Sequence, residues 1–97
     1  MSLDDFLTLV RESDSPAVDL SEALCALWHA EKGNWDQAHD LAQAMDNVDG
    51  CIIHANLHRE EGDIGNANYW YKRANATMPS SSVVEERHDL IRHYLNS

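Results

Sequence analysis

The sequence predicts an all-α protein. Apolar residues recur at helical spacing along most of the chain, and helix caps and stop signals separate these segments. No run of alternating β-branched residues is present, so nothing indicates a strand. The chain has 97 residues, which is the size of one domain with one modest core. We therefore expect a single helical domain of about six helices.

The first two helices are predicted from their boundaries. Ser2 can cap a helix over about 3–12, whose apolar residues recur at helical spacing. Ser15 and Pro16 then predict a new start, because serine accepts free backbone N–H groups and proline fits the first helical position. Gly33 predicts the end of this second helix.

The next three helices are separated in the same way. Asn34 predicts the cap of the third helix. A fourth helix is expected over about 50–61, ending at Gly62. Asp63 can cap a fifth helix, whose apolar stripe continues until Pro79 ends it.

A capping box formed by Ser82 and Glu85 predicts the start of the sixth helix. Within the single domain 1–97, we expect a first helical pair at about 17–46, a second pair at about 50–79, and capping helices at 1–14 and 80–97.

The two pairs are related by an internal repeat. A shift of 29 residues aligns Ala26 with Ala55, His29 with His58, Glu31 with Glu60, Gly33 with Gly62, and Ala38 with Ala67. Small residues recur where two helices must approach closely, and glycine recurs where the chain must turn. The repeat therefore predicts two similar helix–turn–helix units.

The second unit resembles a tetratricopeptide repeat. The residues that carry the resemblance are Gly62, Asp63, Asn66, Ala67, Tyr71, Ala74 and Pro79. The resemblance covers about residues 20–79, although the repeat spacing here is 29 residues and the family's is 34. It implies a short right-handed α-α superhelix whose concave groove is lined by the first helix of each pair. By this resemblance, Ile52, Asn56 and Arg59 are groove candidates.

The stretch from His54 to Ala74 also resembles the signature segment of a family of small, functionally uncharacterised proteins. It contains the sequence His-Arg-Glu-Glu-Gly-Asp and, further on, Tyr-Trp-Tyr. This second resemblance implies no activity, but it marks the segment as the one that carries function.

The leading functional hypothesis is a protein–protein or peptide interaction module. Arg59 could hold a carboxylate of the partner with its bidentate guanidinium, and Asn56 could orient it. A structural reading, in which Arg59 bridges to a Glu or Asp of its own chain while Asp63 caps the next helix, is favoured over this one. Tyr69 and Trp70 cannot share the core face with their neighbour Tyr71, so they are further candidates for the binding surface. Two units are fewer than such arrays usually need, which predicts a possible homodimer.

The alternative is a small metal-binding or hydrolytic protein centred on His54 and His58. These residues are one helical turn apart and could grip one ion, zinc or another divalent metal. His39, Glu61 or Asp63 could supply a third ligand. In the sequence alone the reading of His54 and His58 as packing residues is favoured over this one, since both align with positions inside the first helical pair.

Composition limits the partners. Seven Lys and Arg against seventeen Asp and Glu disfavour nucleic acid and anionic membranes. Residues 1–49 hold eleven acidic and two basic side chains, so a partner of this half is expected to be basic.

Cys25 and Cys51 lie inside helical patterns, which predicts reduced thiols in the cytoplasm. No phosphate loop or nucleophile motif is present, so an enzyme is not favoured and no catalytic residue is predicted.

Overall fold

The computed structural model describes all 97 residues and confirms the all-α fold class. Its helices are α1 (Leu3–Glu12), α2 (Glu22–Lys32), α3 (Trp35–Ala44), α4 (Val48–Glu60), α5 (Ile64–Arg73) and α6 (Val83–Leu95). None of them is long and apolar enough to cross a lipid bilayer.

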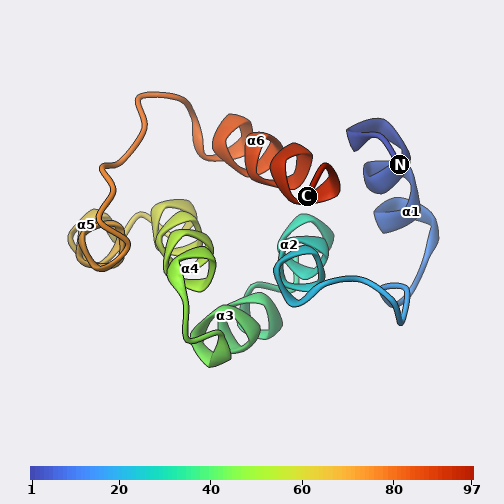
Figure 1. The fold of residues 1–97 in the computed structure, drawn as a ribbon, viewed down its shortest axis with the longest axis horizontal. Coiled ribbons are helices and arrows are strands. Elements are labelled where there is room, and N and C mark those ends of the chain that lie inside the picture. The colour runs from blue at the N-terminus through green and yellow to red at the C-terminus, as the bar shows by residue number, and fades with distance from the viewer.

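The helices form two neighbouring hairpins and two flanking helices (Figure 1). α2 packs against α3, α4 packs against α5, and the hairpins meet where α3 packs against α4. After a long connection, α6 returns to pack across both α2 and α4, while α1 packs against α2 and α6. The two termini therefore lie on the same side of the molecule (Figure 1).

The repeated alanines lie where the hairpins close. Ala26 and Ala38 of the first hairpin and Ala55 and Ala67 of the second are all fully buried. The main core gathers apolar side chains from every helix except α5, and a second small cluster forms between α4 and α5 around Tyr71. Small residues thus bring the paired helices close together, as the repeat predicts.

Three helix ends share one backbone motif. Gly33 and Gly62 have φ values of 89° and 84°, in the left-handed region that suits glycine. Asn75, with φ 56°, takes the same role after α5: its N–H donates to Lys72 and the next N–H donates to Tyr71. The prediction that the fifth helix extends to Pro79 is therefore wrong, because asparagine also adopts this terminating conformation.

The predicted start of the second helix at Ser15 and Pro16 is also wrong. α2 begins at Glu22, and the Ser21 hydroxyl accepts the cap hydrogen bond from Leu24 N–H. Val18 in the preceding loop is fully exposed, so an earlier start would gain no burial to stabilise it.

The predicted caps are otherwise mostly correct. Ser2 and Ser82 both form complete capping boxes, and Asp63 caps α5. Asn34 is the exception: its side chain makes no cap hydrogen bond, and its amide nitrogen lies 3.3 Å from Nδ1 of His29.

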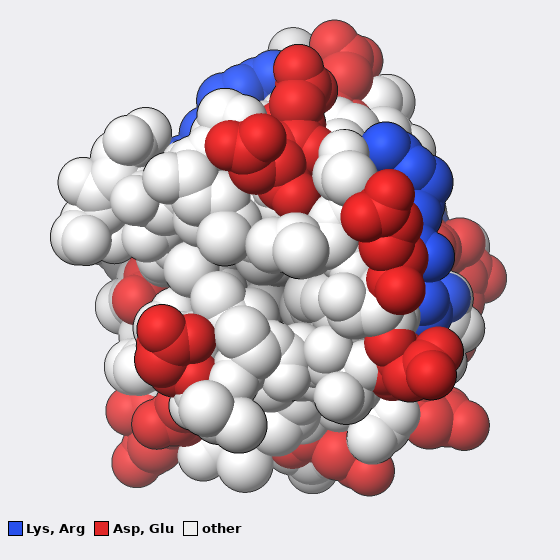
Figure 2. All heavy atoms as spheres, turned by 90° about the vertical axis from the view of Figure 1, so that its right-hand side faces the viewer, with Lys and Arg blue, Asp and Glu red and all other residues white.

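Charge is spread over the surface. Figure 2 looks on the side that carries α1, where separate acidic side chains are scattered among uncharged ones. Lys and Arg atoms are visible there only along part of the margin. The acidic side chains on this face are therefore dispersed and do not form one continuous patch there.

Candidate metal centre

α4 presents two different faces. One face lies toward α3 and α5, which both pack on α4 and do not pack on each other. The opposite face lies toward α6. His54 and His58 belong to the first face and Asn56 and Arg59 to the second, since residues four apart share a face and residues two apart do not.

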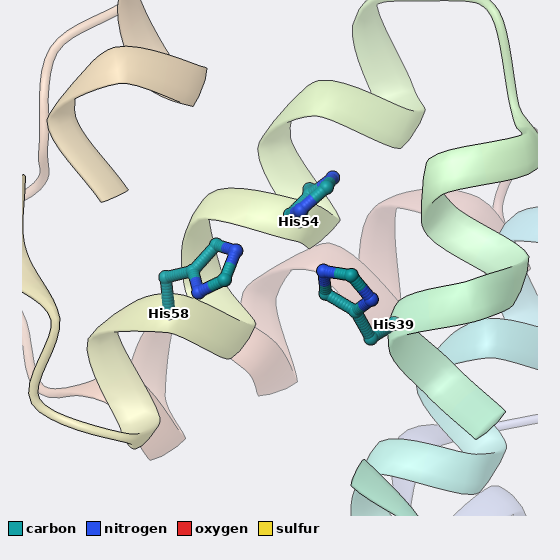
Figure 3. Close-up of side chains that lie close together, drawn as sticks. All are labelled: His39, His54 and His58. Atoms are coloured by element: carbon teal, nitrogen blue, oxygen red, sulfur yellow. The ribbon is translucent and has the colours of Figure 1, made fainter. Parts of the chain in front are cut away.

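Three histidines meet on the α3–α5 face of α4, and we call them the histidine cluster (Figure 3): His39 of α3, and His54 and His58 of α4. One ring nitrogen from each lies within 4.8 Å of the other two. The ring centroids of His54 and His58 are 4.8 Å apart, and the His39 ring meets both edge-on. Of the three residues predicted as possible third ligands, His39 is the one that joins this group.

Two tryptophans enclose the histidine cluster. Trp35 stacks on His39 with an interplanar angle of 15°, and its indole N–H donates to the Leu57 carbonyl. Trp70 stacks on His54 at a centroid distance of 3.9 Å. The two imidazoles are thus oriented by large flat neighbours rather than by hydrogen bonds.

His54 is 3% exposed and forms no hydrogen bond within the protein, and its ring nitrogens are not among the fully buried atoms. Burial, followed by the nearby His39 and His58 rings, lowers the pKa of His54 to about 4. The imidazole is therefore neutral at pH 7, with a free lone pair in the middle of the cluster. Neutral imidazole is the form that binds a metal ion.

His58 has a carboxylate partner. Oε1 of Glu61 lies 2.6 Å from Nδ1 of the His58 ring. Glu61 and Asp63 form a second group of possible ligands with His58, but Asp63 is also engaged as the cap of α5, accepting from Asn66 N–H.

The histidine cluster fits a tetrahedral ion that uses three protein ligands. At the usual Zn–N distance, ligand nitrogens stand about 3.4 Å apart, so closing from 4.8 Å needs side-chain movements of about 1 Å. No fourth His, Cys, Asp or Glu comes within the same distance of all three rings. The fourth position would be taken by water.

The groove residues face α6. Asn56 is fully buried, and its amide donates to Glu86 Oε1 and to the Val83 carbonyl, both in α6. Arg59 donates to Glu86 Oε1 at 2.9 Å, and the Tyr71 hydroxyl donates to the same carboxylate at 2.7 Å. The residues predicted to hold a partner's carboxylate thus hold one from their own chain.

The remaining candidates are placed separately. Ile52 is half-buried on α4, and Trp70 lies against His54. Tyr69 is 52% exposed and meets Trp70 edge-on, with the Arg73 guanidinium over both rings. The five predicted binding residues therefore do not form one continuous surface.

Two contributors were not predicted as functional. Trp35 belongs to an apolar stripe, and such a stripe does not distinguish a wall of a site from packing. Glu86 is a charged residue next to Glu85, and only the docking of α6 places its carboxylate beside Asn56.

None of the cavities is lined by a residue of the histidine cluster. The most enclosed cavity, about 140 Å³, lies beside α1 and is lined mainly by apolar side chains that include Phe6, Leu20 and Trp28. No protein-family model, curated protein or solved structure matches this chain.

Proposed function

We propose that this protein binds a divalent transition-metal ion, Zn²⁺ in the first place, through His39, His54 and His58. One observation supports this most strongly: three imidazoles from two helices converge, so that one ring nitrogen of each lies within 4.8 Å of the other two. Imidazole nitrogens gathered at this spacing are suited to share one ion.

The ligand set favours a particular class of metal. Three imidazole nitrogens suit Zn²⁺, Cu²⁺, Ni²⁺ or Co²⁺, whereas Mg²⁺ and Ca²⁺ prefer oxygen ligands. Because none of the cavities is lined by a residue of the cluster, the proposal is metal binding and does not extend to hydrolysis. Cys25 and Cys51 are free thiols, which supports a reducing compartment such as the cytoplasm.

The test compares two histidines at equivalent positions of the repeat. Protein purified without chelator is analysed for metals, and the metal-free chain is titrated with Co²⁺ and Zn²⁺. We expect one equivalent per chain, and stabilisation of about 2.7 kcal/mol at a free metal concentration one hundred times the dissociation constant. His58→Ala should abolish stoichiometric binding, whereas His29→Ala, which removes a buried histidine outside the cluster, should not. Equal binding by both variants would contradict the proposal.

A second function is favoured by the contacts of Glu86. Arg59 and Asn56 hold the carboxylate of an α6 residue, which is the contact predicted for a helical partner. We propose that the α6 face of α4 is a helix-binding surface occupied by the chain's own α6, and by α6 of a second copy when the two exchange. The predicted homodimer would then form by exchange of α6 between two chains.

Exchange of α6 can be measured with a labelled peptide of residues 80–97. Glu86→Ala in the full chain weakens the docking of its own α6, so this variant should bind the peptide more tightly than the parent does. A peptide carrying Glu86→Ala is the matched control and should bind neither chain. If the variant binds both peptides equally, the carboxylate does not direct recognition and the proposal fails.

A further inference from the structure

The position of Glu61 is fixed by the turn between α4 and α5. Glu61 directly follows the last residue of α4, and Gly62 takes its left-handed conformation next to it. Backbone bonds close the turn on both sides: Gly62 N–H donates to Arg59 at 3.0 Å, and Asp63 N–H donates to His58 at 2.9 Å. The Glu61 carboxylate is therefore held beside the His58 ring by the backbone as well as by its own contact.

The contact with Glu61 decides which nitrogen of His58 is free. An ionised carboxylate can only accept, so at 2.6 Å the Nδ1–H of His58 donates to Glu61 Oε1. The lone pair of the neutral ring is then on Nε2. We propose that Glu61 is the positioning residue of the metal centre, which fixes the tautomer and the ring orientation of His58 so that Nε2 faces the ion. This inference rests on the proposed function.

The proposal has a physical precedent in general metal chemistry. A ligating histidine usually donates its second ring N–H to a carboxylate or carbonyl, and this partner raises the basicity of the ligand nitrogen. The carboxylate also places an acidic group close to a site that otherwise consists of imidazole rings. Glu61 fulfils both roles from outside the histidine cluster.

The first hairpin shows the opposite arrangement at the equivalent position. Nδ1 of His29 faces the amide nitrogen of Asn34, which can only donate. His29 therefore accepts at Nδ1 and carries its proton on Nε2. His29 and His58 occupy the same position of the repeat and carry the ring proton on different nitrogens. The reason is the neighbouring group, which is an amide nitrogen at His29 and a carboxylate at His58.

Asp40 offers a matched control for Glu61. Its Oδ1 lies 3.9 Å from Nδ1 of His39, beyond hydrogen-bond distance, and its side chain is strongly exposed. Asp40→Ala and Glu61→Ala each remove one carboxylate next to one ligand histidine, but only the second removes a hydrogen bond to the ring.

The first measurement is the affinity of the metal-free variants for Co²⁺. Loss of a partner outside the ligand shell typically weakens metal binding about 10–100-fold, and we expect this range for Glu61→Ala. Glu61→Gln retains an oxygen that can accept from Nδ1 and should weaken binding less. Asp40→Ala should bind close to the parent affinity. The backbone of Glu61 lies in the right-handed region, φ −82°, so alanine fits there without strain.

The second measurement is the tautomer of His58 in the metal-free chain, read from its ring ¹⁵N shifts. We expect the proton on Nδ1 in the parent and in Glu61→Gln, and loss of this preference in Glu61→Ala. His29 should keep its proton on Nε2 in all variants and serves as an internal reference. A merely structural role of Glu61 would leave the His58 tautomer unchanged.

The outcomes separate this inference from the proposed function. If the parent binds no Co²⁺, the metal-binding function fails and the role of Glu61 fails with it. If the parent binds Co²⁺ and Glu61→Ala binds equally well with His58 unchanged, only the inference about Glu61 is overturned. A second bound equivalent that disappears in Glu61→Ala would make Glu61 a ligand of another ion, together with Asp63, and would also overturn it.

Discussion

The two hairpins have one backbone plan and different chemistry. His29 and His58 occupy the same position of the repeat, and both are buried near a turn that ends with a left-handed glycine. In α2–α3 the histidine accepts from an asparagine amide, whereas in α4–α5 it donates to a glutamate carboxylate. Only the second arrangement leaves Nε2 free beside other imidazoles. The hydrogen-bond partner and the presence of two further imidazoles therefore separate a packing histidine from a candidate ligand.

The faces toward α6 differ just as clearly. Leu27 of α2 and Asn56 of α4 are equivalent in the repeat, and both are fully buried. Leu27 belongs to the main apolar core, whereas Asn56 joins a polar network with Glu86 and Arg87 of α6. At this position of the repeat, the first hairpin thus contributes apolar burial to the main core, and the second contributes hydrogen bonds to α6. The polar network fixes the register of α6 on α4, because its donors and acceptors match at one position only.

The largest effect is expected when the first hairpin is given the residue of the second. Leu27→Asn removes a fully buried apolar side chain and buries an amide in a region without polar partners. We expect the free energy of unfolding to fall by about 3–5 kcal/mol. Urea denaturation measures this loss. If the free energy of unfolding falls by less than about 1 kcal/mol, α2 tolerates a polar side chain at this position as α4 does.

The reciprocal substitution, Asn56→Leu, should lower the free energy of unfolding by less. Asn56→Leu removes the acceptor of the Arg87 Nε–H and one of the donors to Glu86. Glu86 keeps Arg59 and Tyr71, and Arg87 keeps Glu60, so we expect a loss of about 1–3 kcal/mol, mainly from the Arg87 Nε–H that is left without an acceptor. The measurement is the same urea titration. A variant more stable than the parent would show that the network contributes specificity of docking and no net stability.

The sequence predicts the local features of this fold better than its long-range contacts. The cap at Ser2, the capping box at Ser82 and the glycine turns at Gly33 and Gly62 were predicted correctly, since they depend on neighbouring residues. The end of α5 was missed because Asn75 adopts a conformation for which glycine is the usual signal. Local rules therefore fail where two residue types can serve the same purpose.

The candidate site, too, can be predicted from the sequence only as far as local spacing reaches. The pairing of His54 with His58 follows from helical spacing, but the place of His39 beside them depends on how α3 crosses α4. Likewise, Asn56 and Arg59 were recognised as carboxylate binders, while the identity of the carboxylate depends on the return of α6 after a long connection. Sequence periodicity gives the face of a helix, and it does not give the element that covers that face.

The smallest predicted effect concerns the pH dependence of stability in the first hairpin. Burial lowers the pKa of His29 below its ordinary value of 6.5, so the unfolded chain takes up the proton at a higher pH than the folded chain does. Stability is therefore retained above pH 6.5 and decreases as the pH falls below it. In the presence of a chelator, urea midpoints of the parent should decrease from pH 7.5 to pH 5, and those of His29→Gln should decrease less. Part of the slope should remain in the variant, because His54, with a pKa of about 4, contributes in the same direction. If the urea midpoints of the parent and of His29→Gln depend on pH equally, His29 keeps its ordinary pKa. The difference between His29 and His58 would then rest on the tautomer of His58 alone.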